Sequence, residues 1–167
     1  ALDARRRWDN RATNPGGSAG FSDMIICLTP NPAIDRTLIL PSLVLGNVQR
    51  AEQVIVAAGG KGLNVARAIR ILDGESLCMG FAGGYAGHLL ADLAQNAGLH
   101  FSWTWIDSET RTCIILVSQN GDATEIDEPG MPVSKSDWKR LQQDVHQQIS
   151  SANLVCVCGS LPPLSSA

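Results

Sequence analysis

The amino-acid sequence predicts an α/β fold built on a largely parallel β-sheet that is covered by helices. Segments with the composition of strands alternate along the chain with segments whose apolar residues recur at helical spacing. Glycine, asparagine and serine residues follow several of the expected strands, which is where parallel sheets bind their ligands. With 167 residues, of which 44% are hydrophobic, the chain is long enough to build a core.

The N-terminal part divides into an extension and three expected strands. Residues 1–23 are rich in Arg, Asn, Gly and Ser and lack apolar periodicity, so we expect a flexible extension. Residues 24–29 form an apolar run that is typical of a buried strand. Residues 36–40 and 49–56 predict two more strands, which the turn-rich residues 41–46 separate.

Two helices and an intervening strand are predicted between residues 63 and 98. The apolar residues of the first helix are Leu63, Ala66, Ile69 and Leu72. Those of the second helix are Leu90, Leu93, Ala94 and Ala97, and Gly98 is expected to end that helix. Residues 77–82 supply the strand between the two helices.

Three strands are predicted next, and two of them form a hairpin. Residues 101–106 and 112–117 have strand composition. Asn120-Gly121 then marks a tight turn into a strand over residues 123–127. The sequence Glu128-Pro129-Gly130 breaks the pattern.

A helix and a last strand complete the expected elements. Ser134 and Asp137 have the spacing of a capping arrangement at the start of a helix. That helix would bury Trp138, Leu141 and Val145. Residues 154–157 are expected to form a core strand.

The segment Gly59-Gly60-Lys61-Gly62-Leu63-Asn64 leads directly into the first predicted helix. Free backbone N–H groups and the helix dipole favour an anion at such a point, so the segment indicates a phosphate or sugar-phosphate site. It is not a Walker A loop, because Gly62 stands where Ser or Thr should follow Gly-Lys. It is not a dinucleotide-binding motif either, because Val65 replaces the third glycine. A glycine-rich helix start without a ligand is the alternative.

Charge and cysteine content exclude several classes of function. A formal net charge of -3 argues against a nucleic-acid partner, and apolar runs such as residues 114–117 are too short to span a membrane. Arg5-Arg6-Arg7 is followed by polar sequence instead of an apolar signal segment, so we expect a cytoplasmic protein. The cysteines lie in apolar runs, as small buried residues do in a reducing compartment. No metal site is predicted, because Cys156 and Cys158 have no second Cys or His pair nearby.

Five short motifs occur in order along the chain. They are Thr29-Pro30-Asn31-Pro32-Ala33-Ile34-Asp35, Gly46-Asn47-Val48-Gln49-Arg50-Ala51, Gly59-Gly60-Lys61-Gly62-Leu63-Asn64, Thr110-Arg111-Thr112 and Cys158-Gly159-Ser160-Leu161-Pro162-Pro163. From Met24 to its last residue the chain resembles the N-terminal half of a PfkB-type carbohydrate kinase of the ribokinase superfamily. The motifs are most similar to those of 1-phosphofructokinase and tagatose-6-phosphate kinase.

The resemblance implies a ribokinase-like fold, with helices on both faces of the sheet and a small β lid. Residues 24–167 would be the N-terminal, substrate-binding part of the kinase domain, with lid strands near residues 36–56 and 101–117. In relatives, the catalytic Gly-Ala-Gly-Asp motif, the ATP-binding loops and the magnesium motif follow the position of Ala167. We therefore expect a truncated chain that has no catalytic residue, is inactive alone, and leaves ATP and Mg mainly to the missing half. The complete protein would be a homodimer formed through the lid.

The resemblance also implies sugar-binding roles for several motif residues. Asp35 would accept hydrogen bonds from sugar hydroxyl groups, although an Asp after a Pro-containing turn can also cap that turn. Gly59 and Gly60 allow the backbone to approach the sugar closely. The Asn64 amide can both donate and accept hydrogen bonds one helical turn later. Helix initiation and capping explain the two glycines equally well but give the amide no role.

Lys61 and Arg111 are predicted to bind the phosphate that the substrate already carries. A phosphate monoester has about two negative charges near neutral pH, and an ammonium and a guanidinium are its natural partners. Arg50, on the second lid strand, would reach a substrate across a dimer interface or be a solvated arginine. Ser160 would touch the sugar or simply belong to the turn after the last strand.

The motifs therefore predict an ATP-dependent kinase that converts D-fructose 1-phosphate into fructose 1,6-bisphosphate. Tagatose-6-phosphate kinase is a close alternative, because a nearly symmetric ketofuranose can present either end to the same phosphate-binding residues. A 6-phosphofructokinase is less favoured, since such relatives often have Gly where this chain has Lys61. From another class, a non-catalytic sugar-phosphate-binding module would need the same residues.

Overall fold

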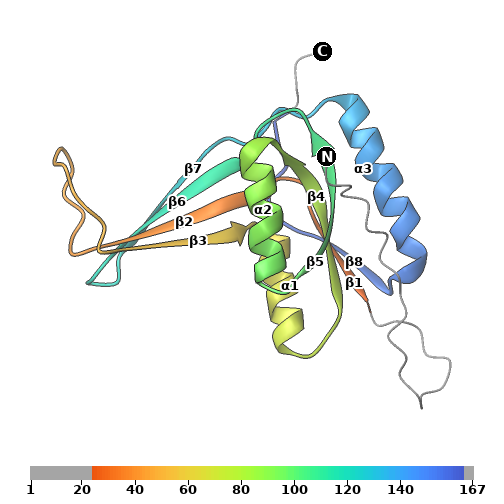
Figure 1. The fold of residues 1–167 in the computed structure, drawn as a ribbon, viewed down its shortest axis with the longest axis horizontal. Helices are drawn as coiled ribbons and strands as arrows, with labels where there is room; N and C mark the ends of the chain where they lie inside the picture. Colours follow the sequence, from red (N-terminus) through yellow and green to blue (C-terminus); the bar gives the residue numbers. More distant parts are fainter. Residues whose placement is uncertain (1–23, 164–167) are drawn as a thin grey trace.

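A computed structural model describes residues 24–163 as two β-sheets with three helices (Figure 1). The first sheet is parallel throughout and has the strand order β5-β4-β1-β8. Its strands are β1 (Ile25–Thr29), β4 (Ser76–Gly83), β5 (His100–Ile106) and β8 (Leu154–Val157). The predicted extension, residues 1–23, lies outside the described residues.

The second sheet has the strand order β3-β2-β6-β7. Its strands are β2 (Ala33–Leu40), β3 (Gln53–Gly59), β6 (Arg111–Ser118) and β7 (Ala123–Asp127). Strand β2 pairs antiparallel with β3 and parallel with β6, while β6 and β7 form the predicted hairpin through Asn120-Gly121. This sheet projects from the helix-covered part of the molecule and ends in the loop between β2 and β3 (Figure 1).

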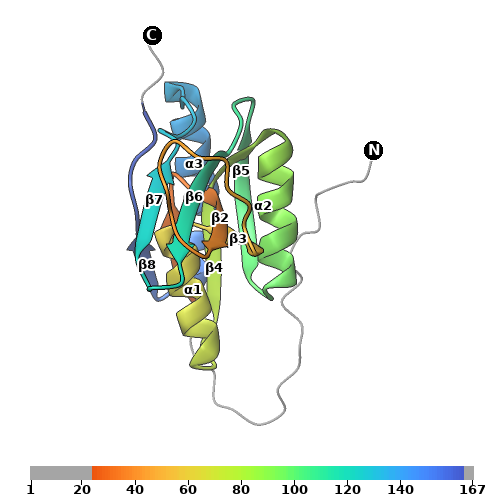
Figure 2. The same ribbon diagram turned by 90° about the vertical axis from the view of Figure 1, so that its left-hand side faces the viewer.

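Helices cover both faces of the parallel sheet, as predicted (Figure 1, Figure 2). They are α1 (Lys61–Ile71), α2 (Gly84–Asn96) and α3 (Lys135–Gln148), the last followed by a 3-10 turn at Ile149–Ser151. Leu63 of α1 and Leu90 of α2 belong to one buried cluster. Leu141 of α3 packs with Phe81 in a second cluster on the other face. No helix within residues 24–163 combines the length and hydropathy needed to cross a membrane.

Two strands differ from their expected places. The sequence groups residues 101–106 with the lid strands, but β5 pairs with β4 inside the parallel sheet. Residues 154–157 are expected to form a core strand, yet β8 is an edge of the described sheet, with 55% of Leu154 exposed. Composition indicates a strand but does not specify its partner, because pairing joins residues that are far apart in sequence.

The cysteines are all free thiols. Cys27, Cys78 and Cys113 are buried, as predicted for small apolar residues in strands. Burial raises the pKa of the Cys78 thiol to about 12, so this residue stays protonated in its apolar surroundings. Cys156 and Cys158 are only partly buried, and their sulfur atoms lie 3.1 Å apart.

The start of α3 provides a test of the fold. The Asp137 backbone N–H donates to Ser134 Oγ at 3.1 Å, and the Ser134 N–H donates to Asp137 Oδ2 at 3.1 Å. We expect Ser134→Ala to lower the free energy of unfolding by about 0.5–2 kcal/mol, because a helix-terminal donor loses its acceptor. Urea denaturation followed by circular dichroism measures the change. An unchanged midpoint would show that this capping box does not stabilise the helix.

Candidate functional site

The candidate site is a pocket of about 190 Å³ beyond the carboxyl ends of β1 and β8. Its lining residues are Asn31, Asp35, Gly60, Lys61, Asn64, Arg111, Cys113, Glu125, Asp127, Gly159 and Ser160. Every predicted substrate-binding residue except Gly59 and Arg50 therefore lines one pocket. Its position agrees with the general location of ligand sites in parallel α/β sheets.

Strand register explains how residues from three strands converge on this pocket. Asp35 of β2 is paired with Cys113 of β6, and Cys113 is paired with Asp127 of β7. Arg111 and Glu125 each lie two residues from this row along their own strands. Residues two apart in a strand face the same side, so the second sheet presents three carboxylates and a guanidinium to the pocket.

Another wall is the first turn of α1. Gly60 is the N-cap residue and no side chain caps the helix, which leaves first-turn N–H groups for a ligand. Lys61 is exposed at the first helical position. Arg67 Nη1 donates to Asn64 Oδ1 at 2.6 Å, and Arg67 Nη2 donates to the Ala58 carbonyl oxygen. The Asn64 oxygen is thus already engaged, and the side chain offers a ligand its amide N–H groups.

Asp35 lies directly against the backbone of β3. A Cβ atom at Gly59 would be 2.1 Å from Asp35 Oδ1, so only glycine leaves room for the carboxylate. Gly59 therefore supports the pocket without lining it. Burial raises the pKa of the Asp35 carboxyl; Arg67 and Arg111 oppose that rise, and the two carboxylates of β7 add to it.

Arg111 is a largely buried cation with unused hydrogen-bonding capacity. Its side chain is 13% exposed, and Nη1 lies 3.6 Å from Asp127 Oδ2. The same nitrogen donates to the Glu128 carbonyl oxygen at 3.2 Å. Within the described residues, the buried Nε has no hydrogen-bond partner. An unpaired buried donor costs free energy, so an anion that reached it would be bound favourably.

Asn31 belongs to the pocket, although the sequence gives it no binding role. Only 4% of the residue is exposed, and Nδ2 donates to Ser160 Oγ at 3.1 Å. Its Oδ1 has no partner among residues 24–163 and can accept a hydrogen bond from a ligand. The sequence feature that could have predicted this role is an asparagine between two prolines, directly after a buried strand.

The structure corrects the position of Arg50 and adds residues that the sequence missed. Strand β3 begins at Gln53, so Arg50 is exposed in the preceding loop and does not line the pocket. Glu125, Asp127 and Cys113 do line it. The hairpin turn at residues 120–121 could have predicted their position, because it brings residue 113 opposite residue 127.

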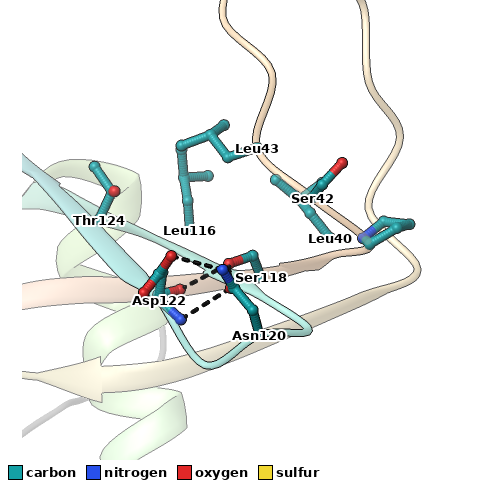
Figure 3. A pocket seen from close by; sticks show the side chains of 9 residues that line it. Leu40, Ser42, Leu43, Leu116, Ser118, Asn120, Asp122 and Thr124 are labelled. Carbon is teal, nitrogen blue, oxygen red and sulfur yellow. Dashed lines mark hydrogen bonds between the residues drawn. The ribbon is translucent and has the colours of Figure 1, made fainter.

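A larger cavity of about 370 Å³ lies at the far end of the second sheet (Figure 3). Three of its polar side chains already bond to one another: Ser118 Oγ donates to Asn120 Oδ1, and Asn120 Nδ2 donates to Asp122 Oδ2 at 2.7 Å (Figure 3). The described residues that line it include no Lys or Arg. An anionic ligand is therefore better matched by the smaller pocket.

Comparison with known families decides what kind of protein carries this pocket. Residues 28–167 match the family described as pfkB family carbohydrate kinase. The chain belongs to the pfkB family. This assignment confirms the predicted resemblance, and it identifies the chain as part of a carbohydrate kinase.

Solved structures of pfkB-type proteins share the fold of this chain. A Thermotoga maritima protein described as a possible 1-phosphofructokinase matches with a TM-score of 0.80 and 28% identity, over 86% of this chain and 47% of its own. The tetrameric inhibited form of Escherichia coli phosphofructokinase-2 matches with a TM-score of 0.78 and 26% identity, over 87% and 47%. The complex of that enzyme with fructose-6-phosphate gives a TM-score of 0.78 at 24% identity, over 87% and 48%. The pfkB chain thus spans about half the length of these structures.

The electrostatics of the pocket can be tested at Asp35. Arg67 lowers the pKa of the Asp35 carboxyl, so Arg67→Gln should raise that pKa further. Arg70→Gln is the matched control, because Arg70 lies one turn later on α1 and outside the pocket. Titration of the Asp35 carboxyl by NMR gives its pKa in each of the two variants. Equal pKa values in the two variants would contradict the proximity of Arg67 and Asp35.

Proposed function

We propose that this chain carries the sugar-phosphate-binding part of an ATP-dependent kinase that converts D-fructose 1-phosphate into fructose 1,6-bisphosphate. The observation that carries the proposal is a single pocket holding two cations, a partly buried carboxylate and a buried amide. Family membership supplies the reaction class, which is phosphoryl transfer to a carbohydrate. The side chains of the pocket support the choice of a carbohydrate that already bears a phosphate.

The phosphate would bind between Lys61 and Arg111. The Lys61 side chain forms no hydrogen bond or ion pair within residues 24–163, and it stands at the positive end of the α1 dipole. Arg111 contributes a buried Nε that lacks a partner among the same residues. A phosphate monoester has enough acceptor oxygens for both side chains and for the N–H groups at the start of α1.

The sugar hydroxyl groups would bind to Asp35, Asn31 and Asn64. Hydroxyl groups both donate and accept hydrogen bonds, and these three side chains offer a carboxylate, an amide oxygen and amide N–H groups. A sugar hydroxyl group can donate to the buried oxygen of Asn31 while the phosphate of the same molecule binds the two cations. A phosphorylated sugar therefore uses more of the pocket than a phosphate ion does.

We propose that ATP and the metal ion bind mainly to residues that correspond to the half of the relatives that this chain does not cover. Kinases of the pfkB family use ATP and a divalent metal ion, and this chain spans 47% of the Thermotoga maritima structure. Within residues 24–163, no group of three or more His, Cys, Asp or Glu side chains is arranged to hold a metal ion. Phosphoryl transfer needs a positioned base, a metal ion and a bound nucleotide, which the resemblance assigns to a later part of the kinase, so we propose that the chain alone is inactive.

The substrate is chosen from three phosphorylated ketohexoses. Fructose 1-phosphate is favoured by Lys61, together with the similarity to a protein described as a possible 1-phosphofructokinase. Tagatose 6-phosphate and fructose 6-phosphate are the alternatives, because each presents one phosphate and several ring hydroxyl groups. A direct comparison of turnover on the three sugars in the full-length protein would rank them.

The second sheet is the surface through which we propose that the protein forms a homodimer. On the face of this sheet opposite the pocket, exposed apolar side chains occur at Val54 on β3 and Ile126 on β7, and the loop between β2 and β3 adds Leu45 and Val48. Burying them against a second copy would remove apolar area from water. Sedimentation of the full-length protein with and without Val54→Glu would test this surface.

The phosphate-binding role predicts the behaviour of two variants of the full-length protein. Lys61→Ala and Arg111→Ala should each weaken fructose 1-phosphate binding by about tenfold to over a hundredfold, the effect of one charge-assisted hydrogen bond. Lys139→Ala, on the exposed side of α3, is the control and should bind normally. Isothermal titration calorimetry gives the affinities, and release of ADP gives the turnover. Unchanged affinity in both pocket variants would overturn the assignment, and binding without turnover would indicate a non-catalytic module.

A further inference from the structure

The pocket contains more negative charge than a sugar-phosphate site needs. Asp35, Glu125 and Asp127 outnumber Lys61 and Arg111 among its charged lining residues. A carboxylate repels a phosphate, so the position of each of these three carboxylates must be explained by another interaction. Asp35 already has one in the proposed function, as the acceptor for sugar hydroxyl groups.

Asp127 is accounted for by its neighbours within the protein. Its Oδ2 lies 3.6 Å from Arg111 Nη1. Burial, and then a hydrogen bond to Asp127, raise the pKa of the Cys113 thiol to about 12. Asp127 thus interacts with the guanidinium and accepts a hydrogen bond from the thiol, and both contacts are structural.

Glu125 has no such partners. Its backbone pairs with Ile115 of β6, but its side chain is exposed and forms no hydrogen bond or ion pair within residues 24–163. It nevertheless lines the same pocket as Asp35, and its charge adds to the rise in the pKa of that carboxyl. A carboxylate that lines the pocket without a protein partner is available to a ligand.

We propose that Glu125 binds the same sugar as Asp35, by accepting a hydrogen bond from a second hydroxyl group, and so determines specificity for polyhydroxylated phosphate esters. The inference rests on the proposed sugar-phosphate function. Glu125 is paired with Ile115, which lies four residues beyond Arg111 on β6. Ile115 lies two residues beyond Cys113, the β6 partner of Asp35, so Glu125 and Asp35 face the same side of the second sheet and line one pocket.

The shared role also predicts the pH dependence of binding. The charged or titratable groups that face Asp35 are Arg67 from α1, Arg111 and Cys113 from β6, and Glu125 and Asp127 from β7, with Lys61 of α1 in the same pocket. Asp35 accepts from a hydroxyl group when ionised, so affinity is lost as the pH falls through its raised pKa. Removing the charge of Glu125 lowers that pKa, so the loss should occur at a lower pH.

The experiment compares three variants of the full-length protein by isothermal titration calorimetry. Glu125→Gln should weaken fructose 1-phosphate binding by roughly three- to tenfold, because a neutral amide oxygen is a poorer acceptor than a carboxylate. Inorganic phosphate should bind this variant at least as well as the wild type. Glu75→Gln removes the same charge outside the pocket and should change neither affinity. Asp35→Asn shows how much affinity is lost when one carboxylate that accepts a hydrogen bond from a sugar hydroxyl group is removed.

The outcomes separate this inference from the proposed function. Normal fructose 1-phosphate binding by Glu125→Gln, beside a loss in Asp35→Asn, would overturn the role of Glu125 and leave the function standing. Equal weakening of inorganic phosphate and sugar phosphate would also overturn it, since Glu125 would then act through the phosphate-binding residues. A wild-type protein that binds inorganic phosphate but none of the sugar phosphates would overturn both. Weaker binding of fructose 1-phosphate but not of inorganic phosphate by Glu125→Gln, together with loss of binding at a lower pH than in the wild type, would support the assignment.

Discussion

The buried turn between β1 and β2 is the constraint on which the rest of the structure depends. Strand β1 belongs to the parallel sheet and β2 to the second sheet, so residues 29–32 join the two sheets. All four residues are buried. A Cβ atom at Gly62 would lie 2.0 Å from Thr29 Oγ1, and one at Gly80 would lie 2.0 Å from the Thr29 carbonyl oxygen. The start of α1 and the middle of β4 therefore close on this turn, and they fix where β2 begins and where Asp35 lies.

Much of the fold could be predicted because its signals are local. The capping box at Ser134, the hairpin at Asn120-Gly121 and the helix end at Gly98 each depend on a few neighbouring residues. The start of α2 could not be predicted in this way. The helix begins at Gly84, well before its apolar pattern, and the Ala86 N–H donates to a carboxylate oxygen of Glu109. A capping residue that is distant in sequence cannot be recognised from the residues next to the helix. The pairing of β5 with β4 could not be predicted for the same reason, because the two strands are separated by α2.

The site was predictable where a motif carried it, and not where strand register did. Asp35, Lys61 and Arg111 stand in recognisable motifs, and the fold brings them to one pocket. Glu125 and Asp127 occur in no such motif, because their place follows from the pairing of β6 with β7. The motif of Arg50 did not give its secondary structure, because β3 begins at Gln53 and leaves Arg50 in the preceding loop. A motif identifies a residue type at a position, whereas register decides what that residue faces.

The division of charge between the two sheets has a thermodynamic consequence. Lys61 belongs to α1, which packs on the parallel sheet, whereas Arg111 and the three pocket carboxylates belong to the second sheet. An anion that contacts both cations therefore connects the two sheets, with each charge-assisted hydrogen bond contributing about 1.5–3 kcal/mol. By linkage, an arrangement of the second sheet and α1 that binds the anion more tightly is favoured by the bound anion to the same extent. The carboxylates are compatible with this arrangement because they stand on the sheet that we propose binds the sugar hydroxyl groups, while the free N–H groups of α1 would stabilise the phosphate from the other side.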